Sequence, residues 1–334
     1  MTTQREIAIE TYGGADTLKV RERPAAEPKA GEVAIDVAYS GINFADIQMR
    51  LGFYPDAPKK PFVPGYEVSG TIAAVGPGVT GWNVGDKVVA GTYFGGYTSR
   101  AVIPAVQAFA LPRHLDLPAG AALPVNYFTA RLALDEMARV RAGDKVLIEC
   151  ATGGVGVLAI QLARHAGAEV TGLTTSAHKK AFIEGLGARA MTKAEWLADA
   201  SATGYDMILN ASGGAEIQPQ RARLAITGRM VCIGLSSGVK DGKRSFVRMG
   251  MAALRTPRIS VLKLFDSNSG IFALNALKVL EDPTWVERLT RSLGDVEAQG
   301  MVPHVGKVFP ATDVAAAHHL LETKGATGKV LLAW

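Results

Sequence analysis

The sequence predicts an α/β fold, in which a doubly wound parallel sheet is combined with an antiparallel β domain. The chain has 334 residues, which exceeds the roughly 250–300 residues at which a single hydrophobic core stops growing. Short strands separated by turns fill residues 7–107, and strands alternate with helices from Asp144 onward. These observations together predict two domains of different architecture.

The first part of the chain has the pattern of an antiparallel β domain. Residues 32–37 alternate in the manner of a half-buried strand, and the apolar run 68–75 ends in Gly76-Pro77-Gly78. Near the end of the chain we expect a strand, a helix and a strand, at residues 305–309, 311–323 and 329–334. We interpret these elements as a return to the first domain. The expected domain limits are 1–122 for the β domain, 123–262 for the parallel-sheet domain and 263–334 for the returning segment.

Composition limits the classes of protein to which the chain can belong. Hydrophobic residues make up 48% of the sequence and charged residues 20%, as in a compact globular protein. The formal net charge of +5 comes from scattered basic residues, without the basic stripe of a nucleic-acid-binding surface. No run approaches the roughly 18 apolar residues of a membrane-spanning helix, and the amino terminus lacks a signal-peptide core. With only Cys150 and Cys232 present, we expect a cytoplasmic protein without a disulfide framework, nucleic-acid partners or a membrane span.

A glycine-rich turn follows the first strand of the parallel-sheet domain. The strand at residues 145–150 runs into Ala151-Thr152-Gly153-Gly154-Val155-Gly156, and a helix follows. The spacing is a variant of the dinucleotide fingerprint in which Ala151 takes the place of the first glycine. Gly153 would let the backbone approach a pyrophosphate, and Gly156 would let the helix pack against the strand. Such a loop alone can be an ordinary tight turn, but the flanking strand and helix favour a dinucleotide site formed by Thr152, Gly153, Gly154, Val155 and Gly156.

The end of the second strand indicates which dinucleotide is bound. A protein that uses NAD places Asp or Glu after this strand to bind the ribose hydroxyls, and no acid follows residues 170–173 here. Thr174, Thr175 and Ser176 offer hydroxyl groups instead, and Lys179 offers a positive charge, which suits the extra phosphate of NADPH. The alternative is that Ser176 only caps the next helix and that the lysines face solvent. We expect NADPH as the cofactor.

Five motifs occur in the order that is found in one enzyme superfamily. They are Gly41-Ile42-Asn43-Phe44-Ala45-Asp46, Pro64-Gly65-Tyr66-Glu67-Val68-Ser69-Gly70, Val75-Gly76-Pro77-Gly78-Val79, Gly85-Asp86-Lys87-Val88 and the glycine turn. The chain resembles the zinc-free medium-chain dehydrogenases/reductases over nearly its whole length. Residues 123–130 and 328–332 are most similar to the branch of the quinone oxidoreductases, zeta-crystallin and the vesicle amine transport protein homologues. The resemblance implies a GroES-like β domain split around a Rossmann domain, a homodimer, and hydride transfer to quinones or α,β-unsaturated carbonyl compounds.

The residues that bind zinc in related enzymes are missing from the matching positions. Tyr66 replaces the histidine of a Gly-His-Glu motif, Asn43 lies near the place of a catalytic cysteine, and residues 91–116 contain no cysteine. Neither a three-ligand catalytic site nor a four-cysteine structural site can be assembled there. We therefore expect no metal.

Without a metal, the oxyanion that develops on a reduced carbonyl needs a hydrogen-bond donor, and a proton must come from a side chain or water. Tyr54 is the leading candidate, because the segment from Asn43 to Tyr54 resembles the one that carries the catalytic tyrosine of mitochondrial-type enoyl thioester reductases. Asn43 would orient the substrate or the ribose. The alternative is that Tyr54 packs at the rim of the site and that Asn43 holds a loop.

The resemblance also implies cofactor contacts further along the chain. Asn126 and Thr129 correspond to positions that touch the nicotinamide ribose or the substrate, unless they only cap a helix. Asn210 and the pair Gly234-Leu235 each follow a strand, so both should lie at the carboxyl edge of the sheet. At Asn210 the chain departs from its relatives, which carry an acid there.

An apolar region at residues 246–272 has three interpretations. It can form a substrate wall, a dimer contact or ordinary inter-domain core. Phe265 and Asn268 within it are the remaining candidates for cofactor contacts.

Two other functions stay open on the sequence. One is an enoyl thioester reductase that acts on acyl-carrier or coenzyme A substrates, for which basic residues such as Lys59 and Lys60 would attract an acidic acyl carrier. The other is a protein that binds NADPH without turnover, because a fold alone does not imply catalysis.

Overall fold

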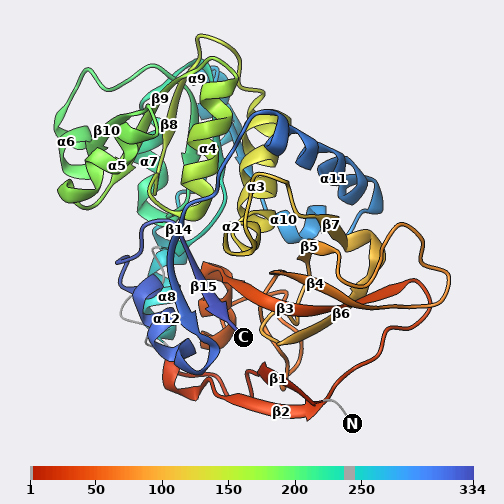
Figure 1. Cartoon of the computed structure of the whole chain (residues 1–334). Helices are drawn as coiled ribbons and strands as arrows, with labels where there is room; N and C mark the ends of the chain where they lie inside the picture. The colour runs from red at the N-terminus through yellow and green to blue at the C-terminus, as the bar shows by residue number, and fades with distance from the viewer. Residues whose placement is uncertain (1–2, 237–244) are drawn as a thin grey trace. The chain divides into compact units, whose positions relative to one another are not determined.

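The computed structural model describes residues 3–236 and 245–334, and these residues form two compact units. The first unit contains the described chain up to Val125 and the segment Leu280–Trp334. The second unit contains the described residues between Asn126 and Val279. One unit has a mainly antiparallel sheet and the other a parallel sheet with helices (Figure 1), which confirms the predicted α/β fold class.

The first unit is built on a seven-stranded sheet and a separate two-stranded antiparallel ribbon. Its strands are β1 (Thr3–Ile7), β2 (Val20–Pro24), β3 (Glu32–Ile42), β4 (Glu67–Val75), β5 (Lys87–Gly91), β6 (Arg100–Pro104), β7 (Ala108–Ala110), β14 (Val305–Pro310) and β15 (Lys329–Ala333). Its helices are α1 (Phe44–Leu51), α2 (Leu117–Ala121), α11 (Pro283–Ala298) and α12 (Val314–Glu322). The sheet runs β14-β15-β3-β4-β5-β7, and β6 also pairs with β3. Strand β15 pairs with β3, so the end of the chain completes the sheet that its first part begins.

Strand β3 organises the core of the first unit. Val33, Ile35 and Val37 share one face of β3, because successive strand residues point to opposite sides. They pack against apolar residues of β4, β5 and β6. The chain then turns directly into α1, whose N-cap is Asn43. This turn places the polar residues Asn43 and Asp46 directly after the end of β3.

The second unit contains a six-stranded parallel sheet. Its strands are β8 (Lys145–Ile148), β9 (Glu169–Thr174), β10 (Arg189–Thr192), β11 (Tyr205–Asn210), β12 (Leu224–Cys232) and β13 (Gly270–Ala273). Its helices are α3 (Pro124–Arg131, whose first two residues belong to the first unit), α4 (Gly154–His165), α5 (Lys180–Gly185), α6 (Lys193–Ala198), α7 (Ile217–Arg221), α8 (Phe246–Leu254), α9 (Val261–Ser267) and α10 (Ala276–Val279). Helix α4 packs against β8 and β9 (Figure 1). A π-helix, Leu132–Ala138, continues α3.

The strand order of this sheet sets the position of a ligand. The order is β10-β9-β8-β11-β12-β13, which is the order of dinucleotide-binding sheets when the strands are numbered from β8. The chain direction of successive crossovers reverses between β8 and β11. Ligands of such sheets bind outside the carboxyl ends of the strands at this switch point.

Strand β13 extends the second unit beyond the sequence-based limit at residue 263. It pairs in parallel with β12, and the second unit continues to Val279. Across the described part of the chain, none of the helices combines the length and the apolar character that crossing a membrane would require.

Candidate functional site

The glycine turn lies between β8 and α4. Cys150 has a left-handed backbone with φ +54°, and its carbonyl oxygen accepts a hydrogen bond from the N–H of Gly153 over 2.9 Å. A Cβ at residue 156 would lie 2.5 Å from the Cys150 oxygen and 2.7 Å from the Cα of Ala151. Gly156 therefore lets α4 begin directly above the end of β8. The first N–H groups of a helix point out of its end and bind anions well, so the geometry fits a dinucleotide phosphate.

Asn126 lies beside this turn on α3. Its side chain is buried, and a Cβ at Gly154 would lie only 2.5 Å from its Nδ2. Thr129 follows one helical turn later and is also buried. Both residues lie within α3, after its first residue Pro124, so neither is its N-cap. The structure thus brings Asn126 to the glycine turn, as a cofactor contact requires.

The end of β9 presents hydroxyl groups and a buried lysine. Thr174 ends the strand, and its Oγ1 accepts a hydrogen bond from the N–H of Ser176 over 3.2 Å. The side chain of Ser176 makes no capping bond to the following turn, and Thr175 is exposed. Lys179 is 8% exposed, and burial lowers the pKa of its ammonium group. Lys180 instead forms an ion pair with Glu195 at 3.0 Å.

The loop after β11 is fixed by two buried polar side chains. Oε2 of Glu149, the residue that follows β8, accepts hydrogen bonds from the N–H groups of Ala211 over 2.8 Å and Ser212 over 3.0 Å. Asn210 accepts from the N–H of Gly213 over 2.9 Å and donates to Gln220 over 2.9 Å. The side chain of Asn210 is fully buried. It therefore shapes this loop and offers no exposed surface for a direct contact with a cofactor, which corrects the expectation for Asn210.

Gly234 and Leu235 pack against the same loop. A Cβ at Gly213 would lie 2.8 Å from the Gly234 oxygen and 2.5 Å from Cδ2 of Leu235. Gly213 also has φ +63°, a backbone conformation that favours glycine. The loops after β11 and β12 are thus in contact at the carboxyl edge of the sheet.

Phe265 and Asn268 lie elsewhere, which corrects the expectation that they contact the cofactor. The carbonyl oxygen of Asn268 accepts a hydrogen bond from the N–H of Thr227 over 2.7 Å, and Thr227 lies in the first half of β12. Both residues also precede β13, which runs parallel to β12. They are therefore at the amino edge of the sheet, opposite the glycine turn, and Phe265 is 82% exposed on α9.

In the first unit, Asn43 belongs to a buried ion-pair network. Its Oδ1 accepts a hydrogen bond from Nζ of Lys329 over 2.6 Å, and its Nδ2 donates to Glu67 over 3.1 Å. Lys329 also forms an ion pair with Glu67, and Glu67 accepts the N–H of Val125 over 2.8 Å. Since both ends of the amide are engaged, the structure supports the role of Asn43 in holding a loop. Sequence reasoning missed Glu67 and Lys329, although each lies in one of the quoted motifs.

A second group of buried polar side chains consists of Asp46 of α1, Tyr97 and His318. Oδ2 of Asp46 accepts hydrogen bonds from the N–H of Asn43 over 2.7 Å and from the Tyr97 hydroxyl over 3.1 Å. The Tyr97 oxygen lies 3.0 Å from Nε2 of His318. Since the tyrosine proton goes to Asp46, His318 carries its own proton on Nε2. Burial, followed by the charge of Arg50, lowers the pKa of His318 to about 3, so the ring is neutral. Burial raises the pKa of Asp46 to about 7.

Tyr54 follows α1 and lies beside Tyr66, the residue in the place of the zinc-ligand histidine. The two rings are 6.4 Å apart. Tyr66 is buried, and burial together with a hydrogen bond to Tyr54 raises the pKa of its phenol well above the usual range. The ring of Phe94 also lies near Tyr66, with ring centroids 5.5 Å apart. Tyr54 is half-buried, so its hydroxyl is held in place without being sealed in the core.

The described side chains around Tyr66 are aromatic and are not zinc ligands. Within residues 3–236 and 245–334, no three His, Cys, Asp or Glu side chains gather closely enough to hold a metal. At the place of the histidine ligand, Tyr66 lies near the rings of Tyr54 and Phe94.

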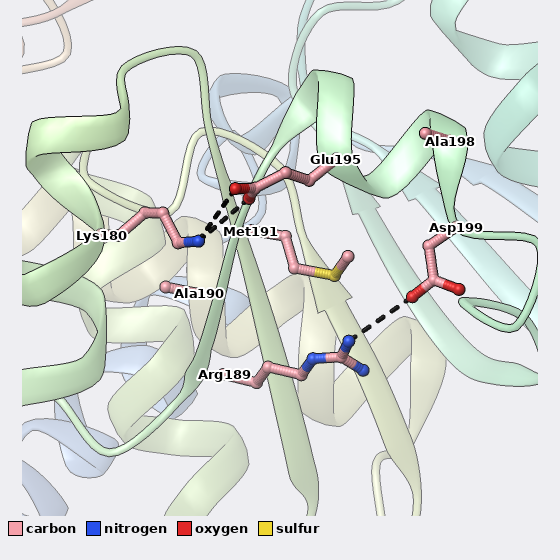
Figure 2. Close-up of a pocket in the computed structure, with 7 residues that line it drawn as sticks. All are labelled: Lys180, Arg189, Ala190, Met191, Glu195, Ala198 and Asp199. Carbon is pink, nitrogen blue, oxygen red and sulfur yellow. Dashed lines mark hydrogen bonds and ion pairs between the residues drawn. The ribbon is translucent and has the colours of Figure 1, made fainter.

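A hollow of about 590 Å³ in the second unit is lined by Lys180, Arg189, Ala190, Met191, Glu195, Ala198 and Asp199, which Figure 2 shows as sticks. Lys180 pairs with Glu195 at 3.0 Å, and Arg189 pairs with Asp199 at 3.5 Å. The lining comes from α5, β10, α6 and the residue after α6, and none of it from the loops after β8, β11 and β12. Because the charges neutralise each other, we assign this hollow no ligand.

Comparison with known proteins gives the family. Residues 29–113 match the alcohol dehydrogenase GroES-like domain, and residues 154–269 match the zinc-binding dehydrogenase domain. The quinone oxidoreductase of Rattus norvegicus is 30% identical over 98% of this chain and 97% of its own length. The synaptic vesicle membrane protein VAT-1 homolog of the same species is 29% identical over 98% of this chain and 83% of its own length.

Solved structures agree with this result. The CurK enoyl reductase has 27% identity and a TM-score of 0.81, with 99% of both chains covered. A mycobacterial protein complexed with NADPH has 26% identity and a TM-score of 0.85, with 99% of this chain and 100% of that chain covered. The fold and the glycine turn thus define an oxidoreductase of the medium-chain dehydrogenase/reductase class. Within this class the chain belongs to the quinone oxidoreductase-like family, as its motifs predict.

We predict that Asp46 makes the stability of the protein depend on pH. The pKa of Asp46 is raised in the folded protein from 3.8 to about 7, so its contribution to stability is complete below about pH 4 and is lost as the pH rises through 7. From this group alone, the free energy of unfolding should fall by roughly 1.4 kcal/mol per pH unit between these limits. Urea unfolding of the wild type and of Asp46→Asn from about pH 5 to 8 should show this fall only in the wild type. The exposed Asp36→Asn is the control, and equal pH profiles for the wild type and Asp46→Asn would refute the prediction.

Proposed function

We propose that the protein is a zinc-independent, NADPH-dependent oxidoreductase that reduces quinones or α,β-unsaturated carbonyl compounds. The observation that carries the proposal is the end of β9, where hydroxyl groups and the buried Lys179 take the place of the acid of an NAD site. A quinone oxidoreductase among the relatives and a neighbour complexed with NADPH support it. When bound, NADPH supplies the hydride.

The second unit provides the groups that bind the cofactor in this proposal. Residues 153–156 and the amino end of α4 receive the pyrophosphate. Thr174, Thr175, Ser176 and Lys179 receive the 2′-phosphate, because a partly desolvated ammonium interacts more strongly with an anion than one in water. Asn126 and Thr129, next to the glycine turn, receive the nicotinamide ribose.

Tyr54 is the proton donor in the proposal. Its phenol donates a hydrogen bond to the carbonyl oxygen of the substrate as negative charge develops there, and it passes on its proton where an enone needs one. The hydrogen bond with Tyr66 holds the Tyr54 ring in one orientation. Asn43 supports the same turn through Glu67 and Lys329.

An enoyl thioester reductase is the second candidate function. The CurK enoyl reductase supports it as a structural neighbour at 27% identity. The chemistry is the same conjugate reduction, so the substrate alone separates the two candidates. A protein that binds NADPH without turnover is the third possibility, and an acceptor panel distinguishes it from both.

A homodimer through the second unit belongs to the proposal. Apolar side chains are exposed along α8, α9 and β13: Phe246, Val247, Met251, Leu254, Val261, Leu262, Phe265 and Phe272. Strand β13 is at the end of the sheet order, so one of its backbone edges can pair with another strand. Exposed apolar side chains in this number are common at interfaces, and two-fold pairs of identical chains are the commonest oligomers.

Replacing Lys179 should weaken the binding of NADPH but not the binding of NADH. A charge-assisted bond contributes roughly 1.5–3 kcal/mol, so Lys179→Ala should raise the Kd for NADPH roughly 10–150-fold and leave the Kd for NADH unchanged. Fluorescence titration with each cofactor measures this. Lys180→Ala is the matched control, because Lys180 is already paired with Glu195. Equal losses for NADPH and NADH would argue against a 2′-phosphate site.

Replacing Tyr54 should slow the reduction of enones and enoyl thioesters much more than the reduction of quinones. Tyr54→Phe removes the acid, so turnover of enones and enoyl thioesters should fall by roughly 10²–10⁴-fold, while quinones, whose reduced oxygens take protons from water, should still turn over. NADPH oxidation with a panel of the three acceptor classes measures this, with Tyr93→Phe as the control. NADPH binding without reduction of any acceptor by the wild type would leave the non-catalytic alternative standing.

The proposed dimer can be tested by introducing charged side chains on α9. Leu262→Glu combined with Phe265→Glu should convert a dimer into monomers, since the α9 face would have to bury two carboxylates. Sedimentation velocity measures the mass. Val106→Glu, which alters an exposed apolar residue of the first unit, should leave the dimer intact. A monomeric wild type, or a dimer that survives the double substitution, would disprove the interface.

A further inference from the structure

Glu149 spans the switch point of the parallel sheet. It follows β8, the strand that leads into the glycine turn, and its carboxylate binds the loop after β11, the strand on the other side of the switch point. The backbone N–H of Glu149 also donates to Leu209 of β11 over 3.0 Å. The carboxylate lies near β12 as well, because its charge adds to the effect of burial in raising the pKa of Cys232. One side chain thus connects the ends of three strands at the place where the cofactor is expected.

The loop at residues 211–213 depends on this carboxylate. Its two N–H groups at Ala211 and Ser212 share the single acceptor Oε2 of Glu149, which is 7% exposed. The next two residues, Gly213 and Gly214, have positive φ values of 63° and 56°, and Gly214 begins the short 3-10 helix Gly214–Glu216. Hydrogen bonds to a buried charged acceptor are stronger than neutral ones. Without the acceptor, the N–H groups of Ala211 and Ser212 would lose these bonds, while the hydrogen bonds made by Asn210 and the contacts with Gly234 and Leu235 would remain.

The direction in which the cofactor lies across the strands indicates which half of it contacts the loop after β11. In the proposed function, the 2′-phosphate lies at the end of β9 and the pyrophosphate lies at the glycine turn after β8. Continuing in the same direction along the sheet order β9-β8-β11-β12, the remaining half of the molecule passes over the loops after β11 and β12. That half is the nicotinamide and its ribose.

We propose that Glu149 is a positioning residue, which fixes the loop after β11 so that the nicotinamide half of the cofactor is held in one place. This inference rests on the proposed function. It predicts a division of effects, because the adenosine half is bound by residues on the other side of the switch point. Loss of the Glu149 acceptor should affect hydride transfer and leave adenosine binding unchanged.

The test uses the full chain and a fragment of the cofactor. The fragment 2′,5′-ADP carries the adenosine and the 2′-phosphate but lacks the nicotinamide. Glu149→Ala should lower kcat at saturating NADPH roughly 10–150-fold, as expected for lost bonds to a charged acceptor, and should leave the Kd for 2′,5′-ADP within about twofold of the wild type. Glu149→Gln, which keeps a carbonyl acceptor, should recover most of kcat. Glu169→Gln, at the opposite edge of the sheet, is the matched control.

The outcomes separate this inference from the proposed function. Wild-type turnover with unchanged kcat in Glu149→Ala would overturn the inference alone. Equal weakening of 2′,5′-ADP binding and of kcat would also overturn it, because a general loss of structure affects both halves. If Glu149→Ala fails to fold, Glu149→Gln decides, and a kcat as low as that expected for the alanine variant would overturn a role in hydrogen bonding. A wild type that binds neither NADPH nor 2′,5′-ADP would overturn the proposed function, and the inference with it.

Discussion

The structure at the carboxyl edge of the parallel sheet depends on hydrogen-bond partners for the backbone N–H groups of the residues that follow the strands. All six strands of this parallel sheet end there, and the backbone N–H groups that leave the sheet have lost their partners in it. After β8 the loop is closed by the Cys150 oxygen and by the start of α4. After β11 the partners are the side chains of Glu149 and Asn210. The edge is therefore built before any ligand arrives, and the N–H groups left over at α4 are those that a phosphate can use.

In the first unit, a buried ion pair and its hydrogen bonds satisfy the buried polar groups. Glu67 and Lys329 are buried at 0% and 4% exposure, and a buried ion pair is tolerated only when further hydrogen bonds complete it. Asn43 and the N–H of Val125 complete it here. Asn43 is consequently part of the framework, and Tyr54 is the residue of this unit to which our proposal assigns the chemistry. Tyr54 is half-buried at the end of α1, where Gly52 terminates the helix with φ +73°.

Local patterns predicted the parts of the site that depend on local structure. The glycine turn and the end of β9 are each continuous in sequence, so strand, turn and helix signals sufficed. The partners of Asn43 and Glu149 could not be predicted in this way, because Lys329 and Ala211 lie 286 and 62 residues away from them along the chain. A carboxylate that ends the apolar run Val146-Leu147-Ile148 was the one available signal for Glu149. Asn268 was misplaced because the edge of the sheet at which it lies follows from the direction of β13, a strand that the periodicity did not reveal.

The place of Glu149 also accounts for the unusual end of β11. The family resemblance implies an acid where Asn210 lies. Here Asn210 is fully buried and serves as both donor and acceptor, a combination that an ionised carboxylate cannot provide. The negative acceptor is supplied from β8 instead, and its oxygen binds the N–H groups of the two residues after Asn210. A negative acceptor for this loop is thus present although residue 210 is an asparagine, so an acid at this position is not required to fix the loop.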